Sequence, residues 1–178
     1  GLSISSVLAS KNYNVVGIDI DNQKCSDIRN GVLPLFEPDL ENTLKIGLKK
    51  KLTISNSFSL INNCDMIFVS VGTPQKSNGA IELAMIKKAT TTIGQIVRKS
   101  KKNPTIFIKS TVVPGTTQDV ILPILEKTSG KKANIDFGLI SNPEFLQESN
   151  AIRDTKYPHA IILGGKQTKY MKKAKMFF

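Results

Sequence analysis

The chain has 178 residues, of which 40% are hydrophobic and 22% charged, and its formal net charge is +11. These proportions are typical of a globular protein with a packed core, and no apolar run approaches the roughly 18 residues that span a membrane. The two cysteines, Cys25 and Cys64, are far apart, and His159 is the one histidine. This composition argues against a disulfide framework, a metal site and a Ser-His triad, and it fits the reducing cytoplasm.

Short apolar stretches alternate along the chain with longer amphipathic ones. Helices are expected at residues 2–10, 22–30, 39–49, 82–99 and 116–127, and strands at 15–20, 66–71, 105–108, 137–140 and 160–163. Gly31 follows the second helix where a C-terminal cap belongs. Strands that alternate with helices predict an α/β fold with a doubly wound parallel sheet of the Rossmann type.

The opening segment, GLSISSVLAS, has no strand in front of it. In a dinucleotide-binding fold, a glycine-rich turn precedes the first helix, and an acid stands about 20 residues further on. Gly1 would be the last glycine of that turn and Asp19 the acid that binds the adenosine ribose. On this interpretation the sheet is truncated at its N-terminus, with its first strand missing. The pattern leaves open that Asp19 only caps the following helix.

Four polar or glycine-bearing stretches each follow a predicted strand or close it. They are VVGIDIDNQKC, FVSVGTPQKSNG, IKSTVVPGTT and SNPEFLQES, and the last carries Glu144 and Glu148. Ligands of open α/β sheets bind at the carboxyl ends of the strands. The four stretches therefore predict one dinucleotide or nucleotide pocket.

The stretches VGTP, KSTVVPGT and NPEFLQES, in this order and together with GVLPLFEPDL, resemble the UDP-glucose/GDP-mannose dehydrogenase family over residues 1–165. The resemblance implies an NAD-dependent, four-electron oxidation of the sugar C6 hydroxymethyl group to a carboxylate, with UDP-glucose as the first substrate to consider. GDP-mannose and UDP-N-acetyl-hexosamines remain alternatives. It also implies a homodimeric full-length protein that makes precursors of surface polysaccharides.

The resemblance assigns roles to individual positions. Asp19 would bind the cofactor ribose with Lys24 beside it, while Gly1, Thr73 and Gln75 would line the cofactor site. Thr111 would lie at the nicotinamide and orient a catalytic water, and Glu148 would lie near both. Glu144 would act as an acid or base. The substrate would contact the segment made of Glu144, Phe145, Leu146, Gln147 and Glu148. An alternative for both glutamates is that they merely favour the start of a helix.

The family's nucleophilic cysteine belongs to a Gly-x-Cys segment that neither Cys25 nor Cys64 matches. We therefore expect residues 1–165 to be an incomplete NAD-binding domain, and residues 166–178 to begin the segment toward a central helix. We expect the 178 residues alone to be inactive. The lysine clusters leave one other class open, a basic nucleic-acid-binding module. The motifs favour a nucleotide-sugar partner instead, with neither nucleic acid nor membrane.

Overall fold

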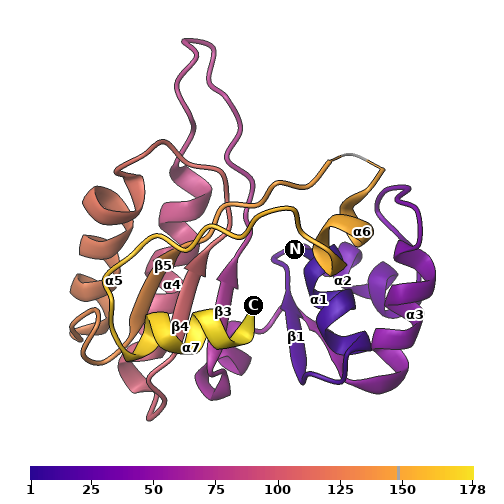
Figure 1. The fold of residues 1–178 in the computed structure, drawn as a ribbon, viewed down its shortest axis with the longest axis horizontal. Helices are drawn as coiled ribbons and strands as arrows, with labels where there is room; N and C mark the ends of the chain where they lie inside the picture. Colours follow the sequence, from indigo (N-terminus) through magenta and orange to yellow (C-terminus); the bar gives the residue numbers. More distant parts are fainter. Residues whose placement is uncertain (148) are drawn as a thin grey trace. The chain divides into compact units, whose positions relative to one another are not determined.

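The computed structural model describes residues 1–147 and 149–178, which form two compact units (Figure 1). Unit 1 comprises Gly1–Phe58 and Phe145–Ala160, and unit 2 comprises Ser59–Glu144 and Ile161–Phe178. Each unit has its own parallel sheet, with strand order β1-β2 in unit 1 and β3-β4-β5 in unit 2. No helix within the described ranges is long and apolar enough to cross a membrane.

Unit 1 is a strand–helix–strand arrangement with a short later helix added to it. Its elements are α1 (Leu2–Ser10), β1 (Val15–Ile18), α2 (Asn22–Arg29), α3 (Leu40–Lys50), β2 (Leu52–Ser55) and α6 (Ala151–Lys156). The two strands pair in parallel, with Val15 opposite Leu52 and Ile18 opposite Ser55. Gly31 adopts a φ of 79° just after α2, as the sequence predicts.

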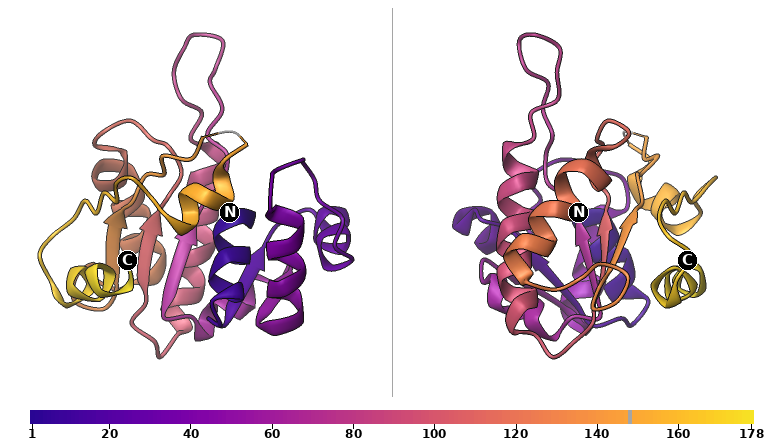
Figure 2. Two further views of the ribbon diagram at one scale, coloured as in Figure 1. Left: turned by 45° about the vertical axis from the view of Figure 1, so that its right-hand side comes forward. Right: turned by 90° about the vertical axis from the view of Figure 1, so that its left-hand side faces the viewer.

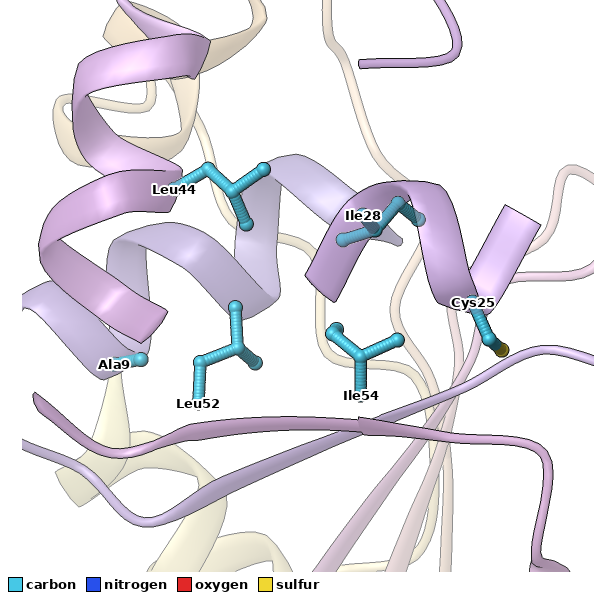
Figure 3. Close-up of a cluster of buried hydrophobic side chains, with 6 residues drawn as sticks. All are labelled: Ala9, Cys25, Ile28, Leu44, Leu52 and Ile54. Carbon is cyan, nitrogen blue, oxygen red and sulfur yellow. The ribbon is translucent and has the colours of Figure 1, made fainter. Parts of the chain in front are cut away.

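A buried apolar cluster holds these elements together. Figure 3 shows its side chains, which come from α1, α2, α3 and β2: Ala9, Cys25, Ile28, Leu44, Leu52 and Ile54. Cys25 is a free thiol with 1% of its surface exposed. Burial of each larger side chain is worth about 1.5–3 kcal/mol, so this cluster accounts for the packing of three helices against β2.

Unit 2 is a three-stranded sheet covered on both faces. Its elements are η1 (Phe58–Asn63), β3 (Met66–Val69), α4 (Ala84–Lys99), β4 (Thr105–Ile108), the π-helical turn η2 (Thr117–Ile121), α5 (Leu122–Ser129), β5 (Gly138–Ser141) and α7 (Lys169–Phe177). Figure 2 shows α4 and α5 on one face and α7 on the other. A Cβ on Gly138 would lie 2.5 Å from the Cβ of Tyr170, so only glycine allows α7 to approach β5 this closely.

The parallel α/β class is confirmed, and four of the five expected strands form. The expected strand at 160–163 is wrong, because those residues form no strand and only the next residue, Gly164, makes an isolated antiparallel bridge with Ser141. Strand β2 and helix α6 were not predicted. Strand β2 has only four residues, in which Leu52 and Ile54 alternate with Thr53 and Ser55, and α6 has only six residues, so both are too short to give a strong periodic signal.

Candidate functional site

Asp19 lies directly after β1, at the carboxyl end of the strand. Its backbone N–H donates to the carbonyl of Ser55, which continues the strand pairing by one residue. Its carboxylate accepts hydrogen bonds from the Lys24 ammonium at 2.5 Å and from the backbone N–H of Asp21 at 3.2 Å. The structure thus places the Lys24 ammonium beside Asp19, and the binding of a cofactor by the two residues stays a prediction.

The charge of Asp19 is set by these contacts. Burial raises the pKa of its carboxyl group, but the hydrogen bonds from Lys24 and Asp21 and the charge of Lys24 outweigh it, so the pKa is lowered. The cap of α2 is Asp21, whose side chain accepts from the backbone N–H of Lys24 at 3.0 Å. Asp19 is thus an ionised acceptor with 33% of its side chain exposed, and it is not the helix cap.

A small cavity of about 240 Å³ lies beside this ion pair in unit 1. Its lining combines carboxylates, an ammonium and apolar side chains: Asp21, Gln23, Lys24, Asp27, Ile28, Val32, Leu33 and Pro34. Ribose hydroxyls need an acceptor such as the Asp19 carboxylate, and an adenine ring suits an apolar wall. These side chains fit the adenosine half of a dinucleotide.

Gly1, the predicted last glycine of the cofactor turn, is exposed at the start of α1. Its carbonyl accepts a hydrogen bond from the Ser5 hydroxyl at 2.7 Å.

In unit 2 the loops after β3 and β4 meet at the carboxyl edge of the sheet. The Thr73 hydroxyl donates to the backbone carbonyl of Thr111 at 2.7 Å. The Ser110 hydroxyl donates to the carbonyl of Val71 at 2.7 Å. The structure thus brings together two predicted site residues, Thr73 and Thr111, in one hydrogen-bonded loop pair.

Gln75 lies on a hairpin that continues from Thr73. It bridges to Ile81 across the hairpin, and its side-chain amide donates to the carbonyl of Gly79 at 3.1 Å. Lys76 and Glu82 form an exposed ion pair at 3.2 Å in the same hairpin. The contact of Gln75 that the structure records is therefore local to the hairpin, and its role at a cofactor stays a prediction.

Glu144 is exposed and follows β5 at the same edge of unit 2, two residues after Asn142. The structure adds Lys109, which the sequence analysis missed. The Lys109 ammonium lies 3.4 Å from the side-chain oxygen of Asn142. Burial lowers the pKa of Lys109, and the negative charge of Glu144 partly opposes that shift. A lysine directly after the apolar strand TIFI is the signal that would have found it, because a charge is seldom placed there without a partner.

The remaining predicted substrate residues, Phe145, Leu146 and Gln147, belong to unit 1, whereas Glu148 lies outside the described residues. Phe145 is 56% exposed. The backbone N–H of Gln147 donates to the Asp154 carboxylate at 2.9 Å, which ties this segment to α6. No group of metal-binding side chains occurs in the part of the chain that the structure describes.

Comparison with known proteins places this geometry in a family. A sequence model described as the UDP-glucose/GDP-mannose dehydrogenase family, NAD binding domain, matches residues 1–178. The chain belongs to this family. Its cofactor is accordingly NAD. The role of Asp19 as the ribose acceptor stays a prediction.

Individual relatives show how similar the chain is to known members. It is 42% identical to a GDP-mannose 6-dehydrogenase of Pseudomonas syringae pv. tomato, over 92% of this chain and 38% of the relative. It is 33% identical to a UDP-glucose 6-dehydrogenase of Haloferax volcanii, over the same shares. The chain thus spans well under half the length of these relatives.

The fold agrees with solved structures of the family. A GDP-mannose dehydrogenase from Pseudomonas aeruginosa, solved as a ternary complex, matches with a TM-score of 0.95 and 34% identity over 99% of this chain and 41% of that one. A UDP-glucose dehydrogenase from Pyrobaculum islandicum matches with a TM-score of 0.89 and 28% identity over 99% and 40%. The Rossmann-type α/β fold expected from the sequence is therefore confirmed.

Proposed function

We propose that the full-length protein is an NAD-dependent nucleotide-sugar 6-dehydrogenase that oxidises the C6 hydroxymethyl group to a carboxylate in two steps. The observation that carries the proposal is the polar edge of unit 2. There the carbonyl of Thr111, the hydroxyl of Thr73, the ammonium of Lys109 and the carboxylate of Glu144 follow three adjacent parallel strands. This is the edge at which α/β sheets bind their ligands.

Within this proposal each side chain has a task that suits its setting. The ionised carboxylate of Asp19 accepts hydrogen bonds from the cofactor ribose, and Thr111 lies at the nicotinamide end. NAD supplies the hydride acceptor. Glu144 is exposed at the edge, and its carboxylate takes up a proton from the water that hydrolyses a thioester.

The thioester step needs a cysteine nucleophile, and neither cysteine of this chain suits it. Cys25 is buried in the core of unit 1. The pKa of the Cys64 thiol is raised, first by burial and then by the negative charge of Asp65, with Lys102 acting weakly in the other direction. A thiol with a raised pKa carries little thiolate at neutral pH and is a poor nucleophile. We therefore assign the nucleophile to a part of the full-length protein other than residues 1–178.

GDP-mannose is our first candidate substrate. Its support is the similarity to GDP-mannose 6-dehydrogenases, which reach 42% identity, against 33–34% for the UDP-glucose 6-dehydrogenases. UDP-glucose, the first substrate expected from the sequence motifs, is the second candidate. Residues 1–165 as the NAD-binding domain, and a homodimer of the full-length protein, remain predictions.

The test is the initial rate of NADH formation by the full-length protein with GDP-mannose, UDP-glucose and UDP-N-acetyl-mannosamine supplied separately. We expect kcat/KM for one of them to exceed the others by at least about 100-fold, since sites that hydrogen-bond their substrate reject analogues by such factors or more. No NADH with any nucleotide sugar would overturn the proposed function. A preference for UDP-glucose would keep the reaction and change the substrate.

A further inference from the structure

Lys109 is fixed at the carboxyl edge of unit 2 by its backbone. Its N–H donates to the carbonyl of Val69 at 2.9 Å, which anchors it to β3 directly after the end of β4. Its side chain is half-buried. The ammonium therefore stays near the edge that carries Thr111 and Glu144, rather than extending freely into solvent.

Asn142 holds this ammonium from one side. It is only 2% exposed, its backbone N–H donates to the carbonyl of Ile108 at 2.9 Å, and its side-chain NH₂ donates to the carbonyl of Ile162 at 2.9 Å. Because the NH₂ group is used in this way, the side-chain oxygen must face Lys109. A buried amide is thus oriented to accept from a lysine, which is a built arrangement and not a chance surface contact.

Glu144 supplies the opposite charge. It follows Asn142 by two residues, and its carboxylate stabilises the charged form of Lys109. No direct ion pair joins the two among the pairs recorded for the described residues. Because Lys109 is half-buried, water screens this attraction less than it would at a fully exposed site. The Glu144 side chain is exposed at this edge.

We propose that Lys109 is a positioning residue for the reaction, and that its ammonium, kept beside Asn142, acts through its charge on the Glu144 carboxylate at the edge that also carries Thr111. The inference rests on the proposed function, because it gives Glu144 the acid or base role. A purely structural role would have Lys109 do no more than satisfy the Asn142 oxygen. The two roles differ in whether the effect of Lys109 depends on the presence of Glu144.

The experiment uses the full-length enzyme and its best nucleotide sugar. Lys109→Met removes the charge, Lys109→Arg keeps it, and Glu144→Gln removes the carboxylate charge. Lys131→Met is the matched control, because Lys131 is also half-buried in unit 2 and donates to a backbone carbonyl, that of Ser100, at 2.7 Å. The readouts are kcat, both KM values and the thermal midpoint of each variant.

We expect Lys109→Met to lower kcat by about 10- to 100-fold with KM for NAD little changed, a part of the 10²–10⁴-fold that a positioned acid or base contributes. Lys109→Arg should recover at least a third of kcat, and Lys131→Met should retain it. Lys109→Met added to Glu144→Gln should lower kcat by less than about threefold, because the group through which Lys109 acts is already gone.

Three results would overturn the inference: an unchanged kcat in Lys109→Met, equal losses in Lys109→Met and Lys131→Met, or losses that multiply in the double variant. If Lys109→Met does not fold, Lys109→Gln replaces it, since its amide can still donate to Asn142 but carries no charge. A wild-type enzyme without turnover on any nucleotide sugar overturns the proposed function and this inference together. If the wild-type enzyme turns over a nucleotide sugar but one of these three results is found, the role of Lys109 is overturned and the proposed function stands.

Discussion

The hydroxyl of Thr73 donates a 2.7 Å hydrogen bond to the backbone carbonyl of Thr111, which lies 38 residues further along the chain. The bond joins the loop after β3 to the loop after β4. It fixes the backbone of Thr111, which is exposed at the edge where we place the nicotinamide. A side chain that orients its neighbour's backbone in this way should affect catalysis without contacting the substrate.

Thr73→Val keeps the shape of the side chain and removes the donor. Since a neutral hydrogen bond contributes about 1 kcal/mol, we expect kcat/KM for NAD to fall by roughly 5- to 10-fold. Steady-state kinetics of the full-length enzyme with varied NAD measures this. Thr92→Val removes a comparable hydroxyl on α4, which donates to the carbonyl of Lys88 at 3.1 Å, and should leave kcat/KM unchanged. Equal effects of the two substitutions would refute a specific role for Thr73.

Asp19→Ala tests the ribose acceptor. A hydrogen bond to a charged group contributes about 1.5–3 kcal/mol, so KM for NAD should rise by roughly 10- to 100-fold while KM for the nucleotide sugar stays within about twofold. Asp65→Ala removes an exposed carboxylate that pairs with Lys102 at 2.8 Å and serves as the control. An unchanged KM for NAD in Asp19→Ala would show that Asp19 does not bind the cofactor.

Asp19 should also affect stability as a function of pH. Its folded-state pKa lies below the ordinary value of 3.8, so the ionised form is favoured by folding. That stabilisation is fully present above about pH 5 and is lost as the pH falls through 3.8 toward the lower folded-state value. Compared with Asp19→Asn, the wild type should therefore lose more of its thermal midpoint between pH 5 and pH 3. Parallel midpoints over that range would contradict the lowered pKa.

Glu37 should stabilise α6 from a distance of 114 residues in sequence. Its carboxylate is 7% exposed and accepts a hydrogen bond from the backbone N–H of Ala151 at 2.8 Å. Glu37→Ala leaves that N–H without its partner, so local opening of α6 should become easier by about 1–3 kcal/mol. Hydrogen exchange at residues 151–156 of the full-length protein measures the change.

Two variants sharpen the Glu37 measurement. Glu37→Gln keeps an acceptor oxygen and should recover most of the protection. Glu41→Ala removes an exposed glutamate that pairs with Lys45 at 2.5 Å and should change the exchange by at most about 0.5 kcal/mol. Unchanged exchange in Glu37→Ala would show that Glu37 does not hold α6.

The parts of this fold that the sequence predicts are those with a local signal. Helix α4 has a sustained apolar face, and β4 is four apolar or β-branched residues, so both were predicted almost to the residue. The family resemblance implied that Lys24 lies beside Asp19, and the structure shows the two side chains in contact.

What the sequence did not predict depends on long-range contacts. The link from Glu37 to Ala151 joins a loop to the first residue of α6, and no periodic pattern relates the two. The contact between Lys109 and Asn142 depends on the pairing of β4 with β5, which brings together residues that are 33 positions apart in the sequence. The segment at 160–163 has the apolar, partly β-branched composition of a strand, but it pairs with no strand, and only the following Gly164 bridges to Ser141.

The central claim is a four-electron oxidation of a nucleotide sugar, and the amount of NADH formed per sugar tests it most directly. The full-length enzyme would be given a limiting amount of the preferred nucleotide sugar with excess NAD, and the reaction followed by absorbance until it stops. We predict two NADH for each nucleotide sugar consumed, with the uronate as the product. One NADH per sugar, with an aldehyde as the product, would contradict the account.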